Sequence, residues 1–105
     1  MKYLILLSAM LLSGCQSTPT LCDTNPASAY CDASQYHDTT TVALKAFDGF
    51  KKKKAFAIGR TKDGWEYYGS SYGYKSQEKA QARALDECQR RMEHHGSGEK
   101  CQLIR

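Results

Sequence analysis

The sequence predicts a small α+β fold in which a β-hairpin, a helix and a final short strand are stapled by a disulfide, after a flexible N-terminal tether. An Asp63-Gly64 turn between two strand-like stretches is typical of a hairpin. Helical periodicity follows from residue 76 to residue 93. Five cysteines in 105 residues indicate an oxidising compartment. This length allows one small domain, and 41% apolar residues exclude wholesale disorder.

The hairpin is expected from two stretches, residues 54–59 and 65–71. In the first, Phe56 and Ile58 share one face and the small Ala55 and Ala57 share the other, because strand side chains alternate. This pattern predicts a sheet with large apolar side chains on one face. The small alanines on the other face would let another element pack closely against the sheet.

The helix is expected to begin after Ser76, a good N-cap, and to end near Glu93. Its predicted inner stripe is Gln81, Leu85, Cys88 and Met92, which Ala84 widens. We expect Ala80, Ala82 and Ala84 to let the helix approach a sheet closely. Residues 101–105 are predicted as the final short strand.

The segment from residue 15 to residue 50 reads as a tether, and the domain proper as residues 51–105. Residues 15–44 contain no lysine or arginine and are rich in Ser, Thr, Asn, Asp and Pro. Such a composition buries too little apolar surface to offset the entropy of ordering. A short helix is nevertheless expected over 41–48, where Val42, Ala46 and Phe47 follow helical spacing and can pack on the domain.

The first fifteen residues combine Met1-Lys2, an apolar stretch at 3–12 and Leu12-Ser13-Gly14-Cys15. Ten apolar residues are too few to span a bilayer, which takes about 20, but they suit a secretory signal. The last four residues resemble the lipobox of bacterial lipoproteins. This resemblance implies a signal peptide at 1–14, lipidation of Cys15 with fatty acyl chains such as palmitate, and a membrane anchor. The alternatives are an ordinary signal peptide with a chance cysteine, or a short buried helix.

Gln16 follows the cysteine where an aspartate would resemble an inner-membrane retention signal. The resemblance therefore favours the outer membrane, with the domain facing the periplasm or the cell exterior. We expect no nucleic-acid partner in this compartment.

Four cysteines remain after Cys15 is assigned to lipid, and they allow three pairings. We favour Cys22–Cys31, across an Asn-Pro turn, together with Cys88–Cys101. The latter would pin the helix to the last strand, which in the chain-entropy account contributes about 3 kcal/mol. A longer-range pairing between tether and domain is the alternative.

Residues 54–105, about half of the chain, also resemble the DUF4189-like secreted bacterial domains. The segments that carry this resemblance are residues 54–59, 68–71 and 76–88, followed by Cys101. The resemblance implies a β-hairpin, a helix and a further strand, with a helix cysteine paired to a late one. The family brings a fold but no assigned activity or catalytic residues.

Five aromatic residues around the second strand form the candidate binding surface: Trp65, Tyr67, Tyr68, Tyr72 and Tyr74. Large amphipathic rings are typical anchors for a protein or glycan partner. Because strand residues alternate, Tyr68 should take the face opposite Trp65 and Tyr67, and the alternative is that the rings form core. The helix face with Arg83, Arg90 and Arg91 is a second candidate surface.

The run Lys51-Lys52-Lys53-Lys54 can attract anionic lipid headgroups, or serve as a solvated leader that protects an edge strand from pairing. No nucleophile–base–acid set is evident, and adjacent His94 and His95 should point apart. We therefore expect no metal, no cofactor and no catalysis. The sequence favours an envelope lipoprotein that acts as a binding or structural module. The alternatives are an inhibitor or exclusion factor acting on another envelope protein, and a small envelope hydrolase.

Overall fold

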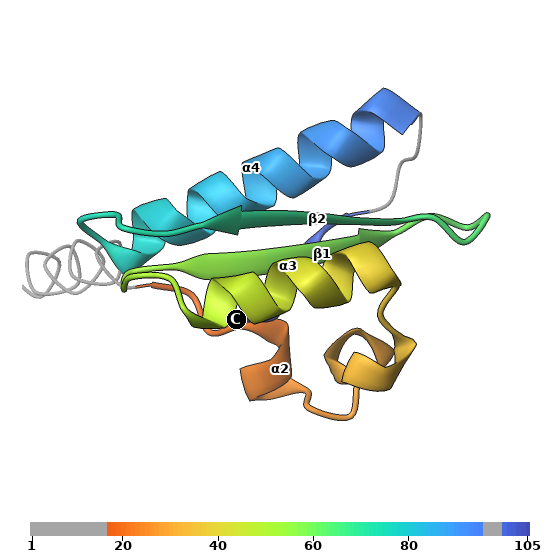
Figure 1. Cartoon of the computed structure of the whole chain (residues 1–105), viewed down its shortest axis with the longest axis horizontal. Coiled ribbons are helices and arrows are strands. Elements are labelled where there is room, and N and C mark those ends of the chain that lie inside the picture. The colour runs from red at the N-terminus through yellow and green to blue at the C-terminus, as the bar shows by residue number, and fades with distance from the viewer. Residues whose placement is uncertain (1–16, 96–99) are drawn as a thin grey trace, which may run out of the picture.

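The structure, a computed structural model, describes residues 17–95 and 100–105. The predicted signal peptide and Cys15 lie outside the described residues. The elements follow in the order α2 (Leu21–Thr24), η1 (Ala29–Cys31), η2 (Ala33–Gln35), α3 (Asp38–Asp48), β1 (Ala55–Arg60), β2 (Glu66–Ser71), α4 (Gln77–His95) and β3 (Gln102–Leu103). The strands form one antiparallel sheet in the order β2-β1-β3, with helices on both faces (Figure 1). The predicted α+β class is confirmed.

The hairpin of β1 and β2 has the predicted turn. Its register runs from Ala55 opposite Ser71 to Arg60 opposite Glu66. Gly64 has φ = 94°, a left-handed conformation that glycine adopts without steric cost. The last strand, β3, pairs with β1 and is shorter than the predicted 101–105.

Helix α4 covers the sheet face that carries Ala55 and Ala57. Its buried residues are Ala80, Gln81, Ala84, Cys88 and Met92, whereas Leu85 is only partly buried. The expectation for Ala82 is wrong, because it lies on the exposed side of the helix. A Cβ on Gly69 would lie 2.0 Å from the carbonyl oxygen of Ala84, so this helix–strand approach requires glycine.

Both favoured disulfides are confirmed. Cys88–Cys101 joins α4 to the start of the last strand, and Cys22–Cys31 joins α2 to η1. Cys88 and Cys101 are both buried in the core between α4 and the sheet. Their disulfide therefore links the helix to the sheet from within this core.

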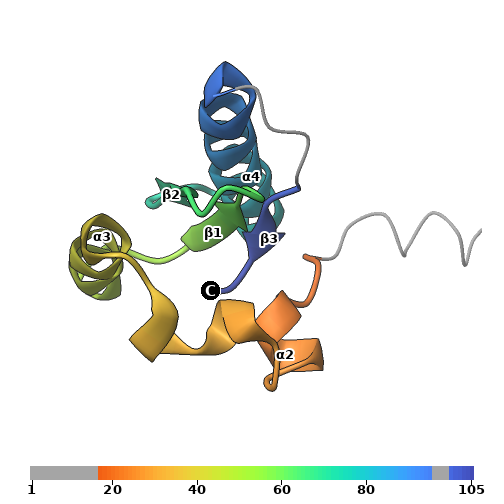
Figure 2. The same ribbon diagram turned by 90° about the vertical axis from the view of Figure 1, so that its right-hand side faces the viewer.

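The second face of the sheet is covered by residues predicted to be a tether. The segment from α2 to α3 wraps beneath β1 and β3 (Figure 2). It contributes to a second core, formed by Tyr36, Leu44, Phe47, Phe56, Ile58 and Ile104. The tether prediction is therefore wrong for residues 21–48, although the helix expected there is confirmed as the longer α3.

Polar residues that suggested a tether in fact begin short helices. The Thr20 side chain accepts a hydrogen bond from the Asp23 N–H in a capping box. Ser28 and Asp32 likewise cap η1 and η2 through their side chains. Capping and packing of a few aromatic rings order a segment whose composition alone favours disorder.

None of the helices within residues 17–95 and 100–105 is long and apolar enough to cross a bilayer.

Candidate functional site

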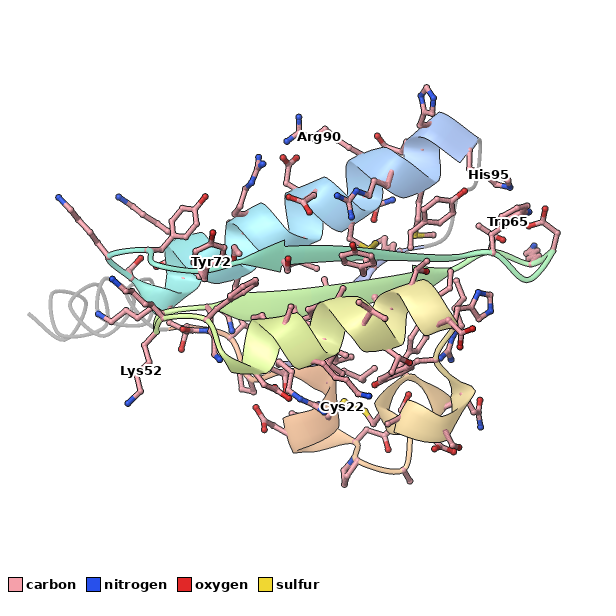
Figure 3. All side chains as sticks on the ribbon, in the orientation of Figure 1. Cys22, Lys52, Trp65, Tyr72, Arg90 and His95 are labelled. Atoms are coloured by element: carbon pink, nitrogen blue, oxygen red, sulfur yellow. A yellow bond between two sulfur atoms is a disulfide. The ribbon has the colours of Figure 1, made fainter. Side chains whose placement is uncertain are left out.

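The structure does not gather the five predicted aromatic residues on one surface. Trp65 and Tyr72, each 55% exposed, lie at opposite ends of β2 (Figure 3). Tyr74 lies in the loop that follows Tyr72 and is 37% exposed. Tyr67 packs against the α4 core, whereas Tyr68 faces the other side and stacks on Phe56 with ring centroids 5.5 Å apart. The predicted alternation of Tyr67 and Tyr68 is confirmed.

A different feature stands out along β2, which is an edge strand. Phe56 N–H donates to the Arg105 carbonyl and its own carbonyl accepts from Ile104, so the backbone of Phe56 points away from β2. All of β2 lies opposite β1, but the direction of the backbone N–H and C=O groups alternates along a strand. The residues of β2 whose N–H and C=O groups point toward β1 are therefore Tyr67, Gly69 and Ser71. The N–H and C=O groups of Glu66, Tyr68 and Ser70 therefore point outward, along the free side of the sheet. We call this row the β2 edge.

On the α4 side, the β2 edge borders an open groove of about 570 Å³. The groove is lined by Tyr67, Arg83, Glu87, Arg90, Arg91 and His94. Glu87 is shared by Arg83 at 3.5 Å and Arg91 at 3.1 Å, so one carboxylate faces two guanidinium groups. The wall of this groove is consequently positive.

On the α3 side, a second groove of about 430 Å³ borders the same strand. Its lining is Asp38, Thr39, Val42, Ala43, Ala46 and Tyr68. Val42 is 68% exposed, although the helical spacing suggested that it packs on the domain. The buried side of α3 is instead formed by Thr40, Leu44 and Phe47, a spacing that the sequence did contain.

Arg91 crosses the β2 edge from α4. Its Nη1 donates to the Tyr68 carbonyl at 2.7 Å, and its guanidinium carbon lies 4.9 Å from the centroid of the Tyr68 ring. A positive side chain at this place hinders uncontrolled pairing with other strands. It also places a charge where a strand added to the sheet would lie.

One end of the β2 edge is held by an ion pair whose carboxylate is buried and whose guanidinium group is partly exposed. Glu66 Oε2 lies 2.8 Å from Arg60 Nε, and Glu66 Oε1 accepts from the His37 N–H at 2.8 Å. Burial by itself raises the pKa of Glu66, but Thr40, Arg60 and the His37 N–H together hold that pKa below its ordinary value. Glu66 is thus a charged structural residue that pairs with Arg60 and does not line the groove.

At the hairpin tip, His95 lies beside Trp65, with ring centroids 5.4 Å apart, and its Nε2 is 3.4 Å from Asp63 Oδ2. A hydrogen bond from the Thr61 hydroxyl is the main cause that lowers the pKa of Asp63. In the described part of the chain, no three His, Cys, Asp or Glu residues are grouped to hold a metal.

No family model, curated protein or solved structure matches this chain. The resemblance of residues 54–105 to DUF4189-like domains therefore stays an expectation from the sequence. The β2 edge, with a positive groove on one side and an apolar groove on the other, is the feature from which a function can be argued.

Proposed function

We propose that this protein is a lipid-anchored, non-catalytic binding module of a bacterial cell envelope, and that the β2 edge binds an extended segment of another envelope protein. The observation that carries this proposal is the outward row of backbone groups at Glu66, Tyr68 and Ser70, between two grooves. Addition of a strand to a free sheet edge is a common mode of peptide recognition. Its main-chain hydrogen bonds supply affinity, and flanking grooves select side chains.

The two grooves indicate the kind of segment that fits. Side chains of an added strand alternate between the faces of the sheet. On one face they meet Val42, Ala43 and Ala46, and on the other they meet Arg83 and Arg91. The preferred segment therefore alternates apolar and acidic residues.

Arg91 has a defined part in this binding. An added strand needs the Tyr68 carbonyl as an acceptor, so the Arg91 hydrogen bond must be released. The guanidinium then lies beside the added strand, where an acidic side chain can pair with it. The Arg91 guanidinium thus exchanges the Tyr68 carbonyl for a carboxylate of the added strand. This exchange keeps the free-energy cost of opening the β2 edge low.

Amide hydrogen exchange tests this proposal on the full-length protein in detergent. The probe is a ten-residue peptide in which valine and glutamate alternate. We expect the probe to slow exchange at the outward N–H groups of Tyr68 and Ser70 about tenfold or more, because they gain hydrogen-bond partners. The N–H groups of Tyr67 and Gly69, already in the β1 ladder, should change little.

Two variants provide a matched comparison. Val42→Asp adds a charge to the apolar groove and should abolish protection by the probe, because Val42 lines that groove. Ala82→Asp adds the same charge at an exposed position of α4 outside both grooves and should leave binding intact. Equal binding of a valine–lysine peptide, or protection confined to other amides, would contradict the proposal.

A further inference from the structure

We propose that one end of the molecule is a docking surface for an anionic phospholipid bilayer, against which the protein lies when anchored. This lysine end comprises Lys51, Lys52, Lys53, Tyr72, Tyr74 and Lys75, from the loops before β1 and after β2. The orientation relative to the membrane rests on the lipid anchor proposed above. The lipid-binding surface itself rests on the following contacts.

The two loops form one surface because they are bonded to each other. Lys53 Nζ donates to the Lys75 carbonyl at 2.8 Å, and Tyr74 N–H donates to the Lys53 carbonyl at 3.3 Å. The rings of Phe50 and Tyr72 have centroids 4.2 Å apart. The loops therefore present their side chains together.

The charge of this end is uncompensated. Lys51 and Lys52 are exposed, and among the described residues their side chains form no hydrogen bond or ion pair. Lys54 differs, since its Nζ donates to the carbonyls of Phe47 and Asp48 at the end of α3. The ion pairs of the described residues have arginine or histidine as the basic partner, and none involves a lysine of this end. A flat surface of anionic headgroups complements this arrangement better than a single ligand does.

Exposed tyrosines accompany the lysines. Tyr72 and Tyr74 are large rings at the end of the molecule rather than in its core. Tyrosine rings with a hydroxyl tip are favoured at the headgroup level of a bilayer, and lysine stems reach over the same region. Figure 3 shows Lys52 and Tyr72 at this end and Trp65 at the far end of the hairpin.

The chain enters the fold close to the lysine end. Thr18 N–H donates to Gln81 Oε1 at 3.0 Å, and Gln81 Nε2 donates to the Thr18 carbonyl at 2.6 Å. Gln81 is about one helical turn from Gln77, whose side chain donates to the Lys54 carbonyl at 2.6 Å. Three residues of chain span at most about 10 Å, so a lipid on Cys15 would reach the membrane from this end.

Fluorescence tests this surface, because Trp65 is the only tryptophan in the sequence and lies at the opposite end of β2. The full-length protein carrying Trp65→Tyr with Tyr72→Trp is reconstituted in phosphatidylglycerol–phosphatidylethanolamine vesicles. Compared with phosphatidylcholine vesicles, we expect a blue-shifted emission and about twofold weaker quenching by acrylamide for the tryptophan at position 72. The wild-type protein, which reports on Trp65, should give the same emission in both vesicles.

Lysine variants separate the surface from overall charge. Lys51→Gln with Lys52→Gln should remove the anionic-lipid dependence of the emission. Lys45→Gln with Lys62→Gln removes the same charge at exposed positions on α3 and in the hairpin turn, and should keep that dependence. Equal effects of the two pairs, or a tryptophan at position 72 that is equally quenched in all vesicles, would overturn the inference.

The anchor is judged separately, from the intact mass of the purified chain and its flotation with phosphatidylcholine vesicles. A chain without acyl groups refutes the anchor. If that chain still binds phosphatidylglycerol vesicles through Lys51 and Lys52, the lipid-binding surface is supported on its own. If it binds neither vesicle, both the anchor and the lysine end are refuted.

Discussion

Arg60 and Glu66 face each other across the β1–β2 register and form an ion pair with Nε and Oε2 2.8 Å apart. The same two side chains fasten the N-terminal segment to the sheet. Glu66 accepts from the His37 N–H, and the Arg60 guanidinium carbon lies 4.9 Å from the centroid of the Tyr30 ring. Removal of this pair should therefore loosen the whole layer that contains α3.

We predict that Glu66→Gln lowers the free energy of unfolding at pH 7 by about 3 kcal/mol, because it leaves Arg60 without its buried partner. The pKa of Glu66 is lower in the folded than in the unfolded chain. Its stabilising contribution is thus present above the unfolded pKa, about 4.3, and is lost as pH falls through the folded pKa. Thermal unfolding from pH 7 to pH 2 measures both effects.

The pH profiles of wild type and Glu66→Gln should converge at low pH. Asp32 and Asp63, whose pKa values are lowered chiefly by hydrogen bonds from Ser34 and Thr61, remain in both proteins and act in the same direction. Glu78→Gln, at an exposed position, is the matched control. Parallel profiles for wild type and Glu66→Gln would show that the pair contributes no pH-dependent stability.

Gly69→Ala should be strongly destabilising. The added Cβ would lie 2.0 Å from the Ala84 carbonyl oxygen and 2.6 Å from the Cys88 nitrogen, and these backbone atoms can move only if α4 shifts. Overpacking of this kind costs about 3 kcal/mol. Denaturant unfolding measures the loss, and Gly49→Ala, whose Cβ would find ordinary contact at 3.6 Å, is the control.

Non-reducing peptide mapping should link Cys88 to Cys101 and Cys22 to Cys31. Replacement of Cys88 and Cys101 by alanine should lower the free energy of unfolding by about 3 kcal/mol in the chain-entropy account. It also removes buried sulfur from the α4 core. The Cys22–Cys31 disulfide is less buried, so its replacement by alanines should lower the free energy of unfolding by less. Free thiols at Cys88 and Cys101 in the purified protein would refute the disulfide-bonded fold.

Cys15→Ser should give an unprocessed or soluble chain, because only the thiol can carry the thioether-linked lipid. Membrane fractionation and the size of the product measure this outcome. The lipobox interpretation would be contradicted if the Cys15→Ser chain had the size of the processed protein and were still found in the membrane fraction that detergent extracts.

Local sequence patterns determined the hairpin, its turn and α4. Phe56 and Ile58 alternate with Ala55 and Ala57 in the structure as in the pattern, and the two groups face different cores. The Cys88–Cys101 bond was predictable because helical periodicity places Cys88 on the inner face of α4. The strand alternation, the Asp-Gly turn and the helical spacing are patterns within a single element or turn, which a sequence displays directly.

The tertiary structure alone decided the role of residues 21–48. Tyr36, Leu44 and Phe47 are too sparse in the sequence to signal a core, but they converge on Phe56 and Ile104 from distant parts of the chain. It also decided the β2 edge, since strand order determines which backbone groups remain unpaired. The exposure of Val42, and its place beside Tyr68, follow from how α3 docks. Sequence periodicity fixes which residues of an element share a face, but the contacts that select the buried face are long-range.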